Sequence, residues 1–254
     1  MIKFRDIEFF YEDKKVVDSV SFEIKKGEKV VLLGNNGSGK STILRLLAGL
    51  YFPRRGEYLL EDKKVDKKSA KVEFRKKVGI LFQNPQSMIF NPTVHDEIAF
   101  SLKEFGFDDI KGRVEKIARE FEIEHLLKQN PLNLSGGEKQ KVVLASILVY
   151  EPEVLFLDEP TASMDPRTTG WFIDMMIELD KSVIIATHDL SLAYEVSDRA
   201  IVINEKHKKI YDGDIEELLK DLDMLLEANL IHKHKHKHKD FSHSHYHTHL
   251  KDTK

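Results

Sequence analysis

A glycine-rich loop is the segment of the chain whose residue types point most directly to chemistry. It lies between an apolar run and a helical run, and its sequence GNNGSGKST fits the pattern GxxxxGK[ST]. Glycines at this spacing let backbone N–H groups turn toward an anion, and the N-terminus of the following helix adds partial positive charge. Lys40 can reach the β- and γ-phosphates of a nucleotide, and the Ser41 hydroxyl can bind Mg²⁺. The candidate phosphate-binding residues are Gly34, Asn35, Asn36, Gly37, Ser38, Gly39, Lys40, Ser41 and Thr42. An ordinary glycine-rich turn is the alternative, but the strand–loop–helix context favours a nucleoside triphosphate site.

Polar side chains that could complete this site follow two other apolar runs. In VLFLDEP, Asp158 could hold Mg²⁺ through water and Glu159 could polarise an attacking water. His188 follows the run at 182–186 and could contact the γ-phosphate. A turn would also explain Asp-Glu-Pro, and a lone histidine at a strand end is often structural. The phosphate loop upstream favours the catalytic interpretation.

The elements that must position these residues alternate between strands and helices. Strands are expected at 2–10, 20–24, 29–33, 78–82, 154–157 and 182–186, and helices at 42–50, across much of 90–129 and at 135–148. Such alternation predicts an α/β fold with a largely parallel sheet. Ligands then bind beyond the carboxyl ends of the strands, where the residues above are expected to meet.

Composition limits the function further. The chain has 254 residues, of which 41% are hydrophobic and 33% charged, and its net charge is −3. This balance argues against a general nucleic-acid binder. Cysteine is absent, which excludes disulfides and cysteine-ligated zinc or iron–sulfur sites. We see no signal-peptide pattern and no apolar run near the roughly 18 residues of a membrane span, and therefore expect a cytoplasmic protein.

The last residues, 231–254, differ from the rest. Six lysines and two aspartates give this tail a charge of +4, which leaves −7 for the preceding body. The tail is of low complexity and nearly free of aliphatic residues, so it is expected to be disordered without a ligand. It contains eight of the 12 histidines: His232, His234, His236, His238, His243, His245, His247 and His249.

A third motif gives these observations a family context. Residues 134–140 read LSGGEKQ ahead of a helix. Together with the motifs above, in this order, they resemble the ATPase subunit of an ABC transporter over residues 1 to about 230. The resemblance implies a P-loop NTPase fold of the ABC ATPase type, with a mostly parallel core sheet and an N-terminal antiparallel β subdomain. It also implies a helical subdomain at about 87–150 and a C-terminal helical extension at about 215–230.

The resemblance also assigns roles to individual residues, with ATP as substrate and Mg²⁺ as cofactor. Residues 34–42 are the Walker A motif, Asp158 the Walker B ligand of Mg²⁺, and Glu159 the general base. Tyr11 resembles the aromatic that stacks on adenine, although Phe9 and Phe10 adjoin it. The remaining matches are Gln83 as the Q-loop glutamine near Mg²⁺ and the attacking water, Ser135, Gly136 and Gly137 as the signature, Asp165 as the D-loop carboxylate, and His188 as the switch histidine. Glu138 stands where glutamine is commoner, a mild departure that leaves the roles of Ser135 and its glycines intact.

The signature implies a partner. A helix N-terminus is an anion site, yet the phosphate loop already holds the phosphates in cis. A head-to-tail pair of ATPase subunits, identical or different, gives each signature a γ-phosphate in trans. Two ATP molecules are then buried at the interface, and hydrolysis separates the halves.

Residues 81–100, LFQNPQSMIFNPTVHDEIAF, narrow the resemblance to the energy-coupling-factor branch and, within it, to cobalt and nickel importers. The implied partners are a transmembrane coupling subunit, facing the segment after the Q-loop, and a substrate-binding membrane subunit. The protein would sit at the cytoplasmic face of the cell membrane. A capped helix entry is the alternative for residues 91–100. The amphipathic stretch 216–230 resembles dimerisation helices of that branch, or else packs on its own domain.

The tail bears on the cargo. In an extended segment residues i and i+2 share a face, and neutral imidazole suits Ni²⁺ and Co²⁺. The tail therefore favours nickel or cobalt over a vitamin, although a purification tag and a solvated tail without function are alternatives. A non-transport ABC ATPase is disfavoured because the chain has one cassette and no heptad insertion. His95, His125 and His207 are interpreted as ordinary surface or packing residues.

Overall fold

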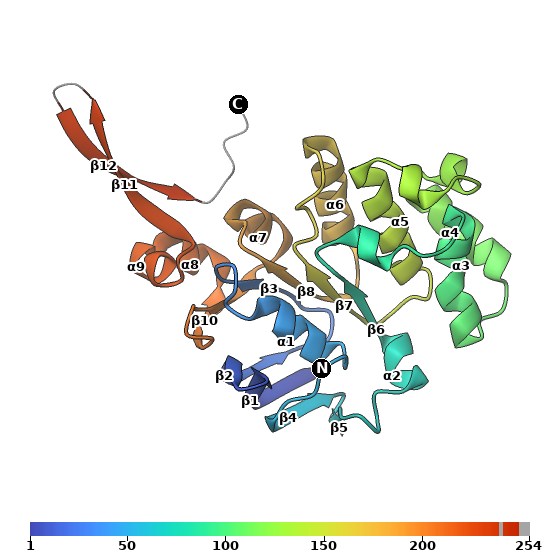
Figure 1. Ribbon diagram of the computed structural model, residues 1–254, viewed down its shortest axis with the longest axis horizontal. Helices are drawn as coiled ribbons and strands as arrows, with labels where there is room; N and C mark the ends of the chain where they lie inside the picture. Colours follow the sequence, from blue (N-terminus) through green and yellow to red (C-terminus); the bar gives the residue numbers. More distant parts are fainter. Residues whose placement is uncertain (239–240, 249–254) are drawn as a thin grey trace.

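The fold is built on two sheets that enclose one helix. The computed structural model describes the backbone of residues 1–238 and 241–248, and the side chains of residues 1–231. The antiparallel sheet has the order β2-β1-β4-β5, and the larger sheet has the order β10-β9-β3-β8-β7-β6 (Figure 1). The strands of the first sheet are β1 (Ile2–Tyr11), β2 (Lys14–Ile24), β4 (Arg55–Leu60) and β5 (Lys63–Lys64). Those of the second are β3 (Lys29–Leu33), β6 (Val78–Leu81), β7 (Val154–Asp158), β8 (Ser182–Thr187), β9 (Arg199–Ile203) and β10 (Lys209–Asp214).

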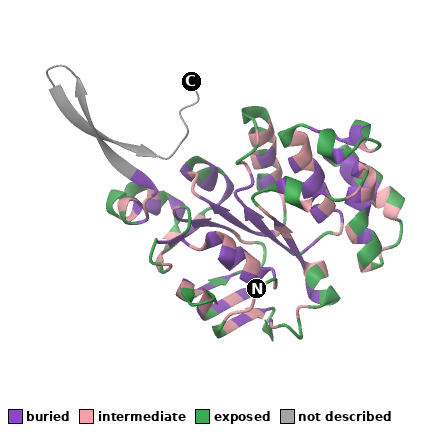
Figure 2. Cartoon of the chain, viewed as in Figure 1, coloured by how far each residue is buried: buried purple, intermediate pink, exposed green. Residues whose placement is uncertain are grey.

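The larger sheet is parallel from β6 to β9, and only β10 runs antiparallel to its neighbour. Alternate residues of its strands enter different cores: Val30 and Leu32 pack with the antiparallel sheet and α1, whereas Val31 and Leu33 pack with the helices of the opposite face. Figure 2 shows these central strands buried along their length. Burial on both faces explains why β3 has a continuous apolar sequence instead of an alternating one. The α/β fold with a mostly parallel core sheet and an antiparallel N-terminal sheet is confirmed.

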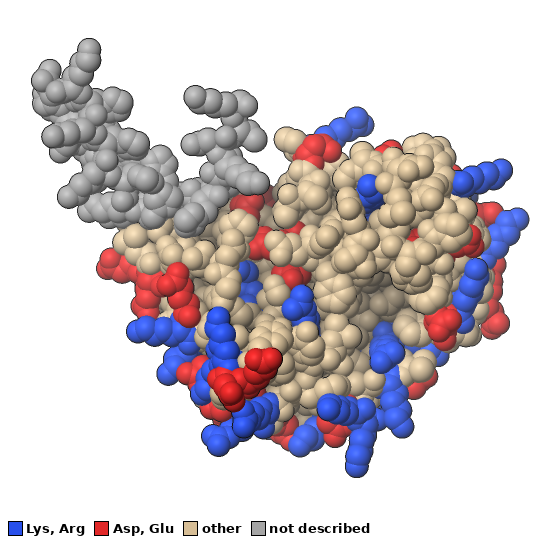
Figure 3. All heavy atoms as spheres, in the orientation of Figure 1, with Lys and Arg blue, Asp and Glu red and all other residues tan. Residues whose placement is uncertain are grey.

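The helices surround this sheet and extend beyond its β6 edge. They are α1 (Lys40–Leu47), α2 (Val72–Lys77), α3 (Val94–Phe105), α4 (Ile110–Glu120), α5 (Gly136–Leu148), α6 (Pro166–Glu178), α7 (Leu190–Val196), α8 (Ile215–Lys220) and α9 (Leu222–Glu227), with short 3₁₀ turns at Pro85–Met88, Glu124–Leu126 and Pro131–Asn133. Helices α3–α5 lie within the expected helical subdomain (Figure 1). Among the described residues, no helix is long and apolar enough to cross a membrane. Charged side chains on the face in view lie mainly around its rim, including the outer side of the helical subdomain (Figure 3).

The C-terminal part consists of the helical stretch expected at about 215–230 and of the tail. The stretch 216–230 forms two short helices, because Asp221 ends α8 and its carboxylate caps α9 by accepting a hydrogen bond from Met224 N. The expected disorder of the tail contrasts with a hairpin, in which β11 (Ile231–His238) pairs antiparallel with β12 (Phe241–Thr248). The strict alternation of residue types along β11 suits the two-residue period of a strand. Residues 239–240 and 249–254, including the candidate ligand His249, lie outside the described residues.

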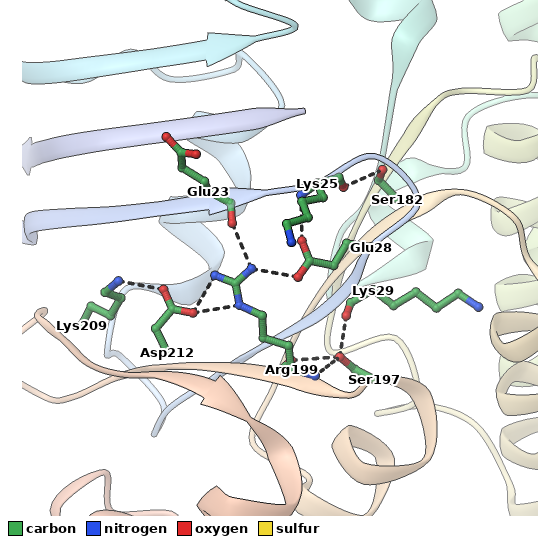
Figure 4. Close-up of polar contacts among 9 residues, drawn as sticks. All are labelled: Glu23, Lys25, Glu28, Lys29, Ser182, Ser197, Arg199, Lys209 and Asp212. Atoms are coloured by element: carbon green, nitrogen blue, oxygen red, sulfur yellow. Dashed lines mark hydrogen bonds and ion pairs between the residues drawn. The ribbon is translucent and has the colours of Figure 1, made fainter.

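Arg199, at the start of β9, ties the two sheets together (Figure 4). Its guanidinium donates to the Asp212 carboxylate at 2.7 and 2.9 Å, to Glu28 at 2.8 Å and to the carbonyl of Glu23 at 3.0 Å. These partners belong to β10, the β2–β3 turn and the end of β2. The planar guanidinium of Arg199 therefore links the antiparallel sheet, at β2, to the β9–β10 side of the larger sheet.

We predict that Arg199→Met lowers the free energy of unfolding by about 2 kcal/mol, between the values for exposed and buried ion pairs. The cost arises because Glu28 and Asp212 lose their shared donor while staying about four-fifths buried. Chemical denaturation measures the change. Arg5→Met is the matched control, because Arg5 is half-exposed and its carboxylate partners lie 3.8 Å away. Equal losses in both variants would contradict a special role for Arg199.

Candidate functional site

The phosphate loop fits closely against the backbone of two strands. It connects β3 to α1, and three of its residues, Gly34, Gly37 and Gly39, have positive φ angles. A β-carbon at Gly34 would overlap the carbonyl oxygen of Ile203 at the end of β9, and one at Gly39 would overlap that of Val16 in β2. These two glycines therefore serve close approach as well as backbone conformation.

Lys40 begins α1 and turns back into the loop. Its ammonium donates to the carbonyls of Gly34 at 2.7 Å and Asn35 at 3.2 Å, and lies 4.0 Å from the Glu159 carboxylate. Burial lowers the pKa of Lys40, and the neighbouring Glu159 and Asp158 carboxylates oppose that shift. The amine is thus held at the centre of the loop, where a phosphate would compete for it.

Ser41 and Asp158 bring together oxygen atoms of the kind that Mg²⁺ prefers. The Ser41 hydroxyl donates to the Asp158 carboxylate at 3.0 Å, and burial raises the pKa of Asp158. Both residues line a cleft of about 550 Å³, and the exposed Gln83 lines it too. A hydroxyl, a carboxylate and an amide oxygen fit Mg²⁺ well.

Glu159 and His188 meet at the carboxyl ends of adjacent parallel strands. One Glu159 oxygen lies 2.8 Å from His188 Nδ1, and the other accepts from the Thr187 hydroxyl at 3.1 Å. Glu159 is buried and has a φ of 44°, a strained conformation for a residue with a side chain. The structure therefore unites the carboxylate and the histidine that the sequence placed after two separate strands.

The aromatic residue expected near adenine lies in a cluster beside this cleft. Tyr11 contacts Phe9 and Tyr51 edge-on, and its hydroxyl lies 3.3 Å from that of Thr42, the last residue of the GNNGSGKST motif. Tyr11 is 38% exposed, so part of it remains accessible to solvent. Sequence reasoning did not identify Tyr51, which lines the cleft; nothing in its local sequence indicates that it reaches Tyr11.

One signature residue, Gly136, lines a second cleft. Gly136 lies with Gln83 and Asn84 around about 360 Å³, together with Ala162 and Ser163. Gln83 and Asn84 also line the first cleft, so the Q-loop separates the phosphate loop from the signature. A β-carbon on Gly137 would meet the side chain of Thr168 in α6, and one on Gly136 would meet Ser163 O.

Two of the expected site residues are also helix caps. Ser135 caps α5: Glu138 N donates to its hydroxyl, and the Glu138 carboxylate accepts from Ser135 N at 2.8 Å and from its hydroxyl at 2.6 Å. These hydrogen bonds lower the pKa of Glu138. Asp165 caps α6 by accepting from Thr168 Oγ1 and from the N–H groups of Arg167 and Thr168.

His207, interpreted from the sequence as an ordinary residue, lies with Nδ1 3.0 Å from the carbonyl oxygen of Ser38 in the phosphate loop. No local signal could have revealed a contact across so much sequence. For the tail, side chains beyond residue 231 are not described, and among the described residues no three potential metal ligands come together.

Comparison with known proteins places this geometry in context. The ABC transporter family model matches residues 17–162. A Methanosarcina acetivorans protein, provisionally named an ABC transporter ATP-binding protein, is 43% identical and aligns with 86% of this chain and 84% of its own. The energy-coupling factor transporter ATP-binding protein EcfA of Methanocaldococcus jannaschii is 38% identical over 91% of this chain and 85% of its own. The structure of CbiO1 from Clostridium perfringens, part of the ABC transporter complex CbiONQ, has a TM-score of 0.78 and 32% identity, and covers 90% of this chain and 94% of its own.

The contact between His188 and Glu159 makes stability depend on pH. The hydrogen bond that His188 donates to the Glu159 carboxylate raises the pKa of His188 above its ordinary value of 6.5, so the folded state binds this proton more tightly than the unfolded state. The pair therefore stabilises the fold fully below the ordinary value, and that contribution is lost as pH rises through the raised pKa. We expect NMR titration of the nucleotide-free chain to give His188 a midpoint above 6.5 that falls in Glu159→Gln. His188→Gln identifies the resonance, and an unchanged midpoint in Glu159→Gln would contradict the assignment.

Proposed function

Because the chain belongs to the ABC transporter family, as an ATP-binding subunit of the energy-coupling-factor type, we propose that it couples ATP binding and hydrolysis to uptake of nickel or cobalt. Members of this kind are ATPases that act in transport, and ATP and Mg²⁺ are their general ligands. The observation that carries the catalytic part is the position of Asp158, Glu159 and His188 at the carboxyl ends of β7 and β8, beside Lys40 and Ser41.

The phosphate loop binds the triphosphate, with Lys40 exchanging its two loop carbonyls for phosphate oxygens. Ser41, Asp158 and Gln83 hold Mg²⁺, which supplies charge neutralisation for the transferred phosphoryl group. Glu159 accepts a proton from the attacking water, and His188 orients that carboxylate and contacts the γ-phosphate. Tyr11 stacks on adenine, next to Thr42.

Two such chains, or this chain and a homologous ATPase subunit, act head to tail. The separation of the two clefts supports this arrangement. Gly136 lines the signature cleft, and Ser41 and Asp158 line the other, with the Q-loop between them. Ser135, Gly136 and Gly137 of one subunit then contact the γ-phosphate held by the other, and Asp165 approaches the same interface.

A pair of exposed aromatic residues after the Q-loop, Phe90 and Phe100, is the proposed contact with the transmembrane coupling subunit. Phe90 is 64% exposed and packs edge-on against Phe100 of α3. Behind them, the buried Glu97 accepts hydrogen bonds from Phe90 N, Asn91 N and the Asn91 side chain. This anchored loop can pass a movement of Gln83 to the membrane partner, which works with a substrate-binding membrane subunit. We infer a peripheral position at the cytoplasmic face of the membrane.

The tail is the proposed metal-handling element and favours nickel or cobalt as cargo. The register of β11 and β12 sets His232 opposite His247, His234 opposite His245 and His236 opposite His243. Directly opposed residues of an antiparallel pair have Cα atoms about 4.5–5.5 Å apart, which brings pairs of imidazole-bearing residues together. Imidazole suits Ni²⁺ and Co²⁺, and the adjacent lysines weaken each site by repelling a dication. Sites of low affinity suit a tail that binds the metal ion transiently and then releases it.

We predict that Glu159→Gln abolishes ATP hydrolysis while retaining ATP and trapping an ATP-bound dimer. The amide cannot accept the proton of the attacking water, whereas the phosphate contacts remain. Phosphate release and size-exclusion chromatography with ATP measure the two properties. Lys40→Ala is the contrasting variant, which should lose ATP binding as well. Full activity of Glu159→Gln would exclude Glu159 as the base.

For the tail, we predict that truncation after Leu230 removes most binding of Ni²⁺ and Co²⁺ in calorimetry without changing ATP hydrolysis. Replacing His232, His234 and His236 with asparagine should have the same effect, and replacing Lys233, Lys235 and Lys237 with glutamine should strengthen binding. Uptake of Ni²⁺, Co²⁺ and a vitamin panel by the assembled transporter tests the cargo separately. Equal metal binding by truncated and full-length chains would exclude the tail as the metal site, and vitamin uptake alone would exclude a metal cargo.

A further inference from the structure

The turn between β9 and β10, residues 204–208, lies against the phosphate loop. His207 Nδ1 is 3.0 Å from the carbonyl oxygen of Ser38, which can only accept, so this nitrogen donates. Nearby, the Glu205 carboxylate accepts from the side-chain amide of Asn35 at 3.1 Å. The turn therefore contacts both the beginning and the end of the loop.

The turn is built to hold one shape. The buried Asn204 accepts hydrogen bonds at its side-chain oxygen from Lys206 N and Lys208 N, and its carbonyl accepts from His207 N. The carbonyl of His207 in turn accepts from Asp18 N in β2 at 3.0 Å. The imidazole therefore leaves a framework anchored on β2, β9 and β10.

His207 adopts a left-handed conformation, with φ of 64°. Glycine reaches this region without steric cost, whereas a residue with a side chain is strained there. Unlike glycine, a histidine at this position supplies a hydrogen-bond donor to the Ser38 carbonyl. The backbone strain thus coincides with a contact to the nucleotide site.

The geometry of a peptide bond connects this contact to nucleotide binding. The chain has no cis peptide bonds among the described residues, so the C=O of Ser38 and the N–H of Gly39 point in opposite directions. When His207 holds the carbonyl on the side of the β9–β10 turn, the Gly39 N–H is aimed at the opposite side of the loop. Backbone N–H groups of the loop are the groups expected to receive the phosphates.

We propose that His207 is a positioning residue for the phosphate loop, which fixes the Ser38–Gly39 peptide so that its N–H faces the nucleotide phosphates. This inference rests on the proposed role of the loop in ATP binding. Glu205 supports the same loop at Asn35 and is itself held by Asn229 at 2.9 Å. Because Glu205 is exposed, its contribution is the smaller one.

Two substitutions of the full chain test the proposal. His207→Gly removes the donor and relieves the left-handed strain, so the unfolding midpoint is expected to stay equal or rise. The dissociation constant for Mg-ATP is expected to increase about 3- to 10-fold, the range that one hydrogen bond supplies. His207→Asn keeps a nitrogen donor the same number of bonds from the backbone and tolerates positive φ, so it should bind ATP within about twofold of the unmodified chain.

The controls separate this role from others. Lys206→Ala changes an exposed side chain of the same turn and should leave ATP affinity unchanged. Lys40→Ala tests whether the loop binds ATP at all. If Lys40→Ala and the unmodified chain bound ATP equally, the proposed nucleotide site would be wrong, and the failure would lie there and not in the role of His207. If Lys40→Ala loses binding while His207→Gly keeps full affinity, His207 is not a positioning residue. Weakened binding with a lower unfolding midpoint in both His207 variants would likewise overturn it.

Discussion

Burial of the parallel sheet on both faces is the constraint on which the rest of the structure depends. Parallel strands need crossovers, and the crossovers place α1 on one face and helices such as α6 and α7 on the other. Each strand must then be apolar throughout, and polar residues can appear only where it ends. Asp158, Thr187 and the phosphate loop all lie at the carboxyl ends of parallel strands. The charged groups of the site therefore gather there because the rest of each strand is buried between the two cores.

In the nucleotide-free chain, the polar groups at the carboxyl ends of these strands form hydrogen bonds with one another. Lys40 bonds to loop carbonyls, Ser41 to Asp158, and His188 to Glu159. Each contact is one that a phosphate, a metal ion or a water molecule would replace. The charged side chains of the site are therefore held in position and each has a partner, which keeps buried charges from standing alone. The buried Ser38 hydroxyl of the phosphate loop, by contrast, has no hydrogen-bond partner among the described residues.

The motif-bearing segments could be predicted from the sequence because their signals are local. The phosphate loop and the apolar runs that end before Asp158 and His188 each carry a strand–turn–helix context within a few residues. LSGG carries the cap and the start of a helix. The antiparallel β4, strands β9 and β10 of the larger sheet, and helices α6 and α7 were not specified, since their sequences are short and the pairing of the strands is decided by distant partners. Tyr51 and His207 were missed for the same reason: what matters about them is which loop they touch. In the tail, composition indicated disorder, whereas the two-residue alternation agrees with the hairpin; the two local signals conflicted.

The capping box at the start of α5 has a consequence for how two subunits would part. In the single chain the Ser135 hydroxyl donates to a carboxylate, Glu138. In the proposed head-to-tail pair the Ser135 hydroxyl would donate to a phosphate, so that one anionic acceptor replaces another. The exchange conserves a charge-assisted hydrogen bond, so little free energy is gained or lost at this point. When the terminal phosphate leaves, the Ser135 hydroxyl can donate again to the Glu138 carboxylate. The proposed interface could then open without leaving this hydroxyl unbonded.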